Sequence, residues 1–425
     1  MEERQSDQAD DTQQTELLSQ KQPLRLLILS WEYPPRVVGG LATAVCGLAE
    51  GLVHHQVEVH VVTSMAENAP SYELRNGVHV HRLSSLFANH AGNMYDWIFH
   101  LNLDMVEEVD RLVEEGLRFD VMHTHDWLVN YAGESLRERY SFPMVTTFHQ
   151  VQALRNRAAG VPEHDAGHQS ELKMVQIGDH FIAVSQAISH ELNEILHISP
   201  DKKVTVIPNG VPLPEEGHVT AEELKQLRAS YSKPEEKLIF FVGRLVIEKG
   251  IHLLLQALPA VIEQEPNVKL LIAGEGYYDK ELHALRDRLG LQEKVEFLGF
   301  IKDELRDQIY RIADLCVFPS KFEPFGIVAL EALAHQTPVI VSDSGGLKEV
   351  ITDRQNGVLV PYNRIDLLQE SIIWALRHPR EMKQMALNGY QELSHRYNWV
   401  QIAKETLAVY EQVISEKKGG GSLVR

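Results

Sequence analysis

Short apolar runs rich in β-branched residues alternate with segments of helical periodicity from residue 24 almost to the end of the chain. This alternation is typical of parallel sheets with helices on both faces, so it predicts the α/β class. The predicted strands are 24–29, 57–62, 78–82, 121–123, 144–148, 181–184 and 204–207 in the first half, and 238–242, 269–273, 295–298, 315–318, 338–341 and 358–360 in the second. Helices are predicted between strands of the first half at 43–54, 96–116 and 186–196.

Residues 208–214 (PNGVPLP) divide these strands into two sets. Their Pro and Gly residues disfavour regular structure, and their length suits a hinge. We therefore predict two doubly wound, Rossmann-like domains, at 23–211 and 212–398. The run 399–416 is amphipathic and predicts a helix that needs a partner surface. The polar, acidic segment 1–22 predicts a disordered tail, and the Gly-rich end, 417–425, predicts a flexible tail or a linker.

Ligands of open parallel sheets bind at the carboxyl ends of the strands. Two such domains that face one another are expected to form a deep cleft, with the connector at its base. Motifs that directly follow a strand are therefore the candidates for the functional site.

Two motifs of the first half follow strands. Gly39 and Gly40 precede a helix and could direct backbone amides at an anion, although a tight turn would use the same residues and the full G-x-G-x-x-G pattern is absent. His125 lies in the segment 123–127 (HTHDW), where an imidazole can hydrogen-bond a sugar hydroxyl. His149 closes the next strand and is a candidate for binding the acceptor. No third ligand at a suitable spacing accompanies the histidines, so we expect no metal.

The first strand of the second half is followed by Arg244, and Lys249 opens the next helix. A guanidinium and an ammonium five residues apart at the mouth of a strand form a site for a diphosphate, since Arg can grip phosphate oxygens with two donors. The competing interpretation is a pair of solvated surface cations.

The most informative segment is 323–331 (EPFGIVALE). Pro324 suits the first turn of a helix, which would leave Glu323 at its entrance and the free amides of Phe325 and Gly326 pointing toward an anion. Glu331 would then lie about 10 Å along the helix axis. This separation suits a sugar nucleotide, with one carboxylate on the sugar, the other on the ribose and the phosphates between them.

Composition excludes several classes of protein. With 41 Lys and Arg against 60 Asp and Glu, the net charge is −19, which argues against nucleic acid as a partner. No apolar run is long enough to span a bilayer, so we expect no integral membrane segment. The two cysteines, Cys46 and Cys316, lie far apart in apolar segments, and the amino terminus has no apolar signal region. We therefore expect reduced thiols and a cytoplasmic protein.

Taken in order, these motifs resemble those of the retaining GT-B glycosyltransferases of group 1, which include glycogen synthases and sucrose synthase. The resemblance covers about residues 24–415 and is closest to the glycogen synthase branch. The segments that carry it are 31–35 with 39–41, 125–127, 207–211, 243–250 and 323–331.

The resemblance implies the GT-B fold, with the helix from residue 399 crossing back onto the first domain. It implies a nucleoside-diphosphate sugar as donor and a carbohydrate or another hydroxyl compound as acceptor. The roles it implies are sugar binding for Glu323, ribose binding for Glu331, diphosphate binding for Arg244, Lys249 and Gly40, contact with the transferred sugar for His125, and a base pocket lined by the loop that begins at Gly299. No cofactor is implied. No Asp-x-Asp motif occurs, as expected if Arg244 and Lys249 replace a metal ion.

One residue departs from the family's pattern. Starch and bacterial glycogen synthases carry a Lys two positions before the double glycine, whereas this chain has Val37. An ADP-sugar-specific glucan synthase is therefore not assured, and a transferase acting on a lipid, cell-wall or small-molecule acceptor remains an alternative. The segments 84–96 and 150–169 have loop composition and are expected to choose the acceptor. The latter carries Arg155, Arg157, His164 and His168.

Other classes share the two-domain plan. Sugar-nucleotide epimerases and glycan phosphorylases are enzymatic alternatives, and a phosphorylase would contain coloured pyridoxal phosphate. A two-lobed binding protein is a non-enzymatic alternative, which the missing signal region disfavours. The sequence leaves the donor base, the sugar, the linkage and the oligomeric state open.

Overall fold

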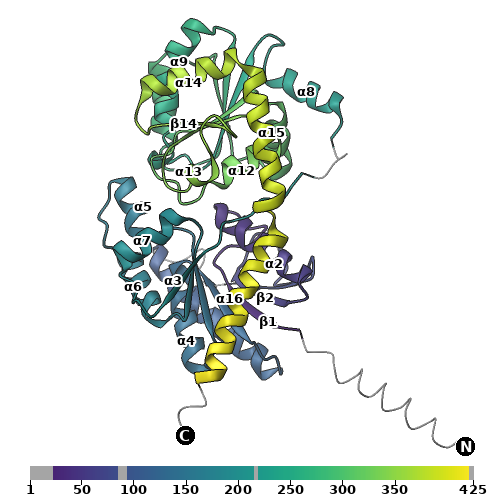
Figure 1. The fold of residues 1–425 in the computed structure, drawn as a ribbon, viewed down its shortest axis with the longest axis vertical. Coiled ribbons are helices and arrows are strands. Elements are labelled where there is room, and N and C mark those ends of the chain that lie inside the picture. Colours follow the sequence, from purple (N-terminus) through teal and green to yellow (C-terminus); the bar gives the residue numbers. More distant parts are fainter. Residues whose placement is uncertain (1–22, 85–92, 215–218, 421–425) are drawn as a thin grey trace, which may run out of the picture.

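The computed structural model describes residues 23–84, 93–214 and 219–420, which form two α/β domains (Figure 1). The predicted tail 1–22 and the last residues, 421–425, lie outside the described residues, as does most of the predicted loop 84–96. The end of that loop is helical, because Asn93 caps a helix by accepting the N–H groups of Tyr95 and Asp96.

The first domain is built on an eight-stranded sheet of order β3-β4-β2-β1-β5-β6-β7-β8. All neighbouring strands are parallel except β3 and β4. The strands are β1 (Arg25–Leu29), β2 (Glu58–Ser64), β3 (Tyr72–Arg75), β4 (Val78–Leu83), β5 (Val121–His125), β6 (Met144–Phe148), β7 (His180–Ala183) and β8 (Lys203–Val206). The seven strands predicted in this half are confirmed, with ends shifted by at most two residues.

Helices cover both faces of this sheet. They are α2 (Gly40–His54), α3 (Met94–Glu114), the short 3₁₀ helix η1 (Trp127–Val129), α4 (Asn130–Tyr140), α5 (Gln152–Ala159), α6 (Ala166–Ile177) and α7 (Gln186–Leu196). The three helices predicted here are confirmed. The loop predicted at 150–169 is wrong, because α5 and the start of α6 occupy it. Their inner faces carry buried polar side chains that a hydropathy pattern does not reveal.

The second domain contains a six-stranded, all-parallel sheet of order β11-β10-β9-β12-β13-β14. Its strands are β9 (Lys237–Val242), β10 (Val268–Ala273), β11 (Val295–Gly299), β12 (Leu315–Phe318), β13 (Val339–Ser342) and β14 (Val358–Val360). Its helices are α8 (Ala221–Tyr231), η2 (Ile247–Lys249), α9 (Ile251–Gln264), α10 (Asp279–Arg288), α11 (Asp303–Ile312), α12 (Ile327–Ala334), α13 (Leu347–Val350), α14 (Ile365–Arg377) and α15 (Pro379–Arg396). All six predicted strands are confirmed to within one residue.

The last helix, α16 (Trp399–Gly420), returns to the first domain and packs along α2 (Figure 1). The contact is close, since a Cβ added to Gly47 of α2 would lie 2.1 Å from the Trp399 ring. The predicted crossing of this helix is confirmed. Residues 417–420 were expected to be flexible but continue the helix, and the Lys417 ammonium donates to the carbonyl of Phe142.

The two chain crossings between the domains lie side by side. Residues 208–214 form no helix or strand, and the Val211 N–H donates to the carbonyl of Tyr397 at 2.8 Å. No helix in the described part of the chain has both the length and the apolar character needed to cross a membrane.

The domains also touch through side chains. The Glu349 carboxylate of α13 accepts the N–H groups of Gln186 and Ala187 at the start of α7, both at 2.8 Å. The Ser185 hydroxyl donates to the carbonyl of Pro324 at 2.8 Å. These bonds bring the carboxyl ends of both sheets together.

Candidate active site at the domain junction

A buried carboxylate shapes the Gly39-Gly40 loop. Glu32 follows β1, is 2% exposed, and accepts the N–H groups of Val38 at 2.6 Å and Gly39 at 3.1 Å. Burial raises the pKa of Glu32 to about 7, against the stabilising effect of these amides. Sequence reasoning missed Glu32, although an acid between Trp31 and Tyr33 was a usable signal. The amide of Gly39 is already occupied by this carboxylate.

Gly40 opens α2 and faces the second domain. A Cβ added there would lie 3.0 Å from the Ile327 side chain, at the first residue of α12. The structure thus brings Gly40 to the amino end of the helix that carries Glu331. The first N–H groups of such a helix lack intrahelical acceptors and can bind an anion.

His125 ends β5 and has one nitrogen without a partner. Its Nδ1 lies 3.0 Å from the Nε2 of His149, with which it shares a hydrogen bond. Its Nε2 is buried and has no hydrogen-bond partner among the described residues. Burial lowers the pKa of His125, so the ring is neutral near pH 7. The free nitrogen can therefore donate to or accept from a polar ligand, according to its tautomer.

The neighbouring histidines have other contacts. His149, predicted to bind the acceptor, lies against His125, and burial lowers its pKa to about 3. The ring of His123 lies on the same face of the sheet, 4.1 Å from that of His125 between centroids, and its nitrogens contact the Tyr410 hydroxyl at 2.6 Å and the Thr147 hydroxyl at 2.7 Å. Within residues 23–84, 93–214 and 219–420 no group of three His, Cys, Asp or Glu side chains could hold a metal ion.

Two further buried carboxylates hold the backbone next to these histidines. Asp126 accepts the N–H of His149 at 2.8 Å, and burial raises its pKa to about 8. Glu171 of α6 accepts the N–H of Gln152 with both oxygens, at 2.8 and 3.0 Å, and burial raises its pKa to about 7. Glu171 therefore fixes the start of α5. No local sequence signal links it to a residue so far away.

In the second domain, Lys249 and Glu323 form an ion pair at 2.6 Å. Lys249 ends η2, and Gly250 follows with φ +69°, where a Cβ would lie 1.9 Å from the carbonyl oxygen of Pro319. Only glycine allows this approach, which carries Lys249 to the loop after β12. The sequence predicted both residues of the pair but not their contact.

Arg244 follows β9 and Gly243, whose φ is +151°. Of the described residues, none forms a hydrogen bond or an ion pair with its guanidinium. Its charge nevertheless acts on Glu32 of the first domain and on Tyr277 of its own. Arg244 therefore lies at the junction with no anionic partner in contact.

The structure corrects the predicted start of the helix in 323–331. Helix α12 begins at Ile327, not at Pro324, because Gly326 precedes it with φ +105°. The helical spacing of about 10 Å expected between Pro324 and Glu331 therefore does not hold. The amides left free by the helix belong to its first turn, from Ile327, and Phe325 is buried, 4% exposed.

Glu331 lies deeper, on α12. It accepts the Tyr310 hydroxyl at 3.0 Å and lies 3.7 Å from the Arg306 guanidinium, while burial raises its pKa. Gly299 ends β11 with φ +65°, and nothing lies within 4 Å of where its Cβ would be. Phe300, which follows, is 64% exposed.

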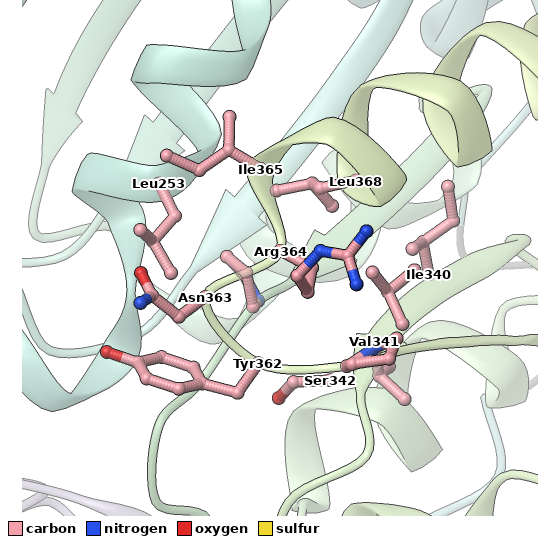
Figure 2. A pocket seen from close by; sticks show the side chains of 12 residues that line it. Leu253, Ile340, Val341, Ser342, Tyr362, Asn363, Arg364, Ile365 and Leu368 are labelled. Carbon is pink, nitrogen blue, oxygen red and sulfur yellow. The ribbon is translucent and has the colours of Figure 1, made fainter.

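Two cavities lie close to this region. One of about 360 Å³ borders the chain crossings and is lined by Phe325, Glu349 and Tyr397, among others. The other, shown in Figure 2, lies between Leu253, Leu368 and the ends of β13 and β14, and at about 10 Å³ has room for about one water molecule. The second cavity is too small for an organic ligand.

Comparisons with known proteins agree with this geometry. Residues 223–392 match the family described as glycosyl transferases group 1, and residues 38–214 match glycosyltransferase family 4. An uncharacterized glycosyltransferase of Methanocaldococcus jannaschii is 36% identical over 390 residues, 91% of this chain and 98% of that protein. The glycogen synthase of Mycobacterium tuberculosis is 32% identical over 415 residues, 93% of this chain and 96% of its own.

Solved structures share the fold. The sucrose-phosphate synthase of Thermosynechococcus elongatus superposes with a TM-score of 0.79 at 25% identity, over 92% of this chain and all of that one. The catalytic domain of starch synthase IV from Arabidopsis thaliana gives a TM-score of 0.75 at 17% identity, over 92% of this chain and all of its own. With two Rossmann-like domains and these relatives, the chain belongs to the group 1 glycosyltransferases of the GT-B fold.

Proposed function

We propose that the protein is a retaining, metal-independent transferase that moves a hexosyl unit, glucosyl in the first instance, from a nucleoside-diphosphate sugar to a hydroxyl acceptor. The observation that carries the proposal is the convergence of Gly40 from one domain with the Lys249–Glu323 pair and the start of α12 from the other. Cations, a carboxylate and free helix amides then surround one space, as a sugar diphosphate requires.

The diphosphate binds Arg244, Lys249 and the first amides of α12. As the glycosidic bond breaks, negative charge grows on the leaving phosphate, and these fixed positive groups stabilise it. Arg244 has no anion to release before binding, whereas Lys249 must exchange Glu323 for phosphate. Gly40 lets the backbone of the first domain approach the same phosphate.

Freed from Lys249, the Glu323 carboxylate accepts hydroxyl protons of the donor sugar. The unpartnered Nε2 of His125 contacts a hydroxyl of the same sugar from the first domain. His149 keeps the ring of His125 in place through its hydrogen bond. Glu331 accepts ribose hydroxyls, and Gly299 leaves open space for the base.

Retention of configuration requires that the acceptor attack on the side of the leaving group. The departing phosphate oxygen then takes the acceptor's proton, so no separate carboxylate base is needed. Arg244 and Lys249 supply the positive charge that other transferases obtain from a divalent ion.

The acceptor proposed first is an α-glucan, which rests on the relative described as a glycogen synthase. A small sugar, a lipid or a cell-wall acceptor is the second candidate, and Val37 in place of the lysine common in starch and bacterial glycogen synthases favours testing it.

The decisive experiment supplies ADP-, UDP- and GDP-glucose separately, with glycogen, with small sugars and with no acceptor, and measures released nucleotide. We expect one donor to be consumed faster when its acceptor is present. The anomeric configuration of the product, read by NMR, tests retention. If no donor gives acceptor-dependent release of nucleotide, a glucosyl donor is wrong.

A second measurement tests metal independence. Transfer should continue after exhaustive treatment with EDTA, because the proposed charge stabilisation uses only side chains and amides. Loss of activity that manganese or magnesium restores would contradict it.

A further inference from the structure

Helix α5 carries a cation of the first domain to the diphosphate side of the junction. Its start is fixed by the two bonds from Gln152 to Glu171, and it packs against η2 of the second domain. The Lys321 ammonium reaches across to the carbonyl of Ala158 at 3.3 Å. Arg155, in the middle of α5, is thereby held close to the segment that contains Arg244 and Lys249.

The packing of α5 on η2 brings Arg155 within electrostatic reach of Arg244. In the described part of the chain, the guanidinium of Arg155 has no hydrogen bond or ion pair, as is also true of Arg244. Burial lowers the pKa of Arg155, and the charge of Arg244 lowers it further. Two half-buried like charges from opposite domains oppose domain closure unless an anion binds between them.

The carboxylates within electrostatic reach of Arg155 already have other partners. They are Glu248, which accepts the Tyr277 hydroxyl at 3.1 Å, Asp126, which accepts the His149 N–H, and Asp165, which caps α6 through the His168 N–H at 2.9 Å. The other arginine of α5, Arg157, is exposed and forms a two-pronged ion pair with Glu163 at 2.8 and 2.9 Å. Of the two arginines on this helix, Arg155 is therefore the one available to a ligand.

We propose that Arg155 and Arg244 bind one phosphate group between them, so that an anion joins the two domains. Planar guanidinium groups suit this task because each can offer two parallel N–H donors to phosphate oxygens. The phosphate belongs either to the donor diphosphate or to a phosphorylated acceptor. The inference rests on the proposed function for the identity of these two ligands, but not for the existence of the anion site.

The first test uses inorganic phosphate and pyrophosphate as probes, with chloride at matched ionic strength. We expect both to raise the melting temperature of the full-length protein, and Arg155→Gln to lose most of this rise. Arg157→Gln is the matched control on the same helix and should keep it. Equal shifts in the wild type and Arg155→Gln would overturn the proposal.

The second test separates the two sources. Calorimetry should show that Arg155→Gln weakens either nucleoside diphosphates or glucose 6-phosphate by roughly tenfold or more, the loss expected for one charge-assisted hydrogen bond. A loss for the diphosphates assigns the phosphate to the donor, and a loss for glucose 6-phosphate assigns it to the acceptor. Unchanged affinity for both overturns the proposal.

A double-mutant cycle tests whether both arginines hold the same group. The Arg155→Gln, Arg244→Gln double variant should lose less affinity than the product of the single losses, because the first change already removes half of the bridge. Purely multiplicative losses would refute a shared phosphate. Arg155→Lys keeps the positive charge but loses the two parallel N–H donors of the guanidinium, so it should recover only part of the affinity. Such partial recovery would also show that the loss in Arg155→Gln does not come from unfolding.

These outcomes distinguish the anion site from the enzyme activity. Phosphate binding that depends on Arg155 in a protein that consumes no nucleotide sugar would leave the site standing and remove the proposed function. Transfer activity in a protein whose binding of every phosphate ligand is unaffected by Arg155→Gln would support the proposed function and refute the anion site.

Discussion

Three buried carboxylates set the shape of loops in the first domain, and each does so by accepting backbone N–H groups. Glu32 holds the double-glycine loop, Asp126 holds the end of β6, and Glu171 holds the start of α5. The loops and His125 could be predicted from the sequence, because each directly follows a predicted strand along the chain. The sequence could not show which acids would be buried, since that depends on residues brought together by folding.

The raised pKa of Asp126 predicts how stability depends on pH. The pKa lies near 8 in the folded protein and near 3.8 in the unfolded chain. The folded state therefore holds this proton more tightly, and the resulting stability is full below about pH 4 and is lost as the pH rises through about 8. Asp126→Asn keeps an oxygen acceptor for the His149 N–H but has no proton to lose.

The melting temperature of Asp126→Asn should consequently rise relative to the wild type between pH 5.5 and 8, then level off. One proton corresponds to a slope of at most about 1.4 kcal/mol per pH unit. Glu67→Gln, at an exposed loop position, serves as the control and should follow the wild type. A difference independent of pH would mean that Asp126 is ionised throughout this range.

The ion pair between Lys249 and Glu323 predicts opposite effects on rate and on binding. Glu323→Gln should lower turnover by roughly 100-fold, because the proposed contact is with the reacting sugar. Affinity for the nucleoside diphosphate should stay the same or rise, since Lys249 no longer has to leave a carboxylate. Steady-state kinetics and calorimetry measure the two effects, with Glu304→Gln, an exposed acid, as control. Parallel loss of both would show that Glu323 supports the nucleotide instead.

At the scale of secondary structure, the predicted elements agree best where burial is apolar. All thirteen predicted strands form, and most of them are runs of apolar residues buried in one of the two sheets, whereas the edge strands β8 and β11 are mainly half-buried. The strand β3 was not predicted from the sequence. It lies at the edge of its sheet, and its Tyr72 and Leu74 side chains are 50% and 61% exposed. Helices α5 and α6 were not predicted because their buried faces are partly polar. Gln152, Asn156 and Glu171 are buried and form hydrogen bonds with one another.

The contact of α2 with α16 predicts the effect of one methyl group. Gly47→Ala should lower the free energy of unfolding by roughly 1–3 kcal/mol, because its Cβ would overlap the Trp399 ring. Gly419→Ala, in the same helix pair but with nothing within 4 Å of its Cβ, should be neutral or slightly stabilising through helix propensity alone. Urea unfolding measures the free energy of unfolding of both variants. Equal effects would mean that α2 and α16 can move apart around the added methyl group without loss of stability.

At the scale of the molecule, the site depends on contact between the domains. Glu349 joins them by accepting two amides at the start of α7. We expect Glu349→Ala to increase the radius of gyration measured by X-ray scattering without ligand, and a nucleoside diphosphate to reduce it again by joining the two half-sites. Glu411→Ala, on the exposed side of α16, should leave the radius unchanged. A nucleotide that fails to compact the Glu349→Ala protein would show that the half-sites do not cooperate.

The position of α16 also has a consequence for the order of folding during synthesis. The first domain leaves the ribosome before the second, yet Tyr410, which is fully buried in the core of the first domain, belongs to α16, which is synthesised after the second domain. The second domain contains its whole sheet before that point. We therefore expect the amino-terminal domain to be the later of the two to reach its native core, with the surface of α2 uncovered until α16 has been synthesised.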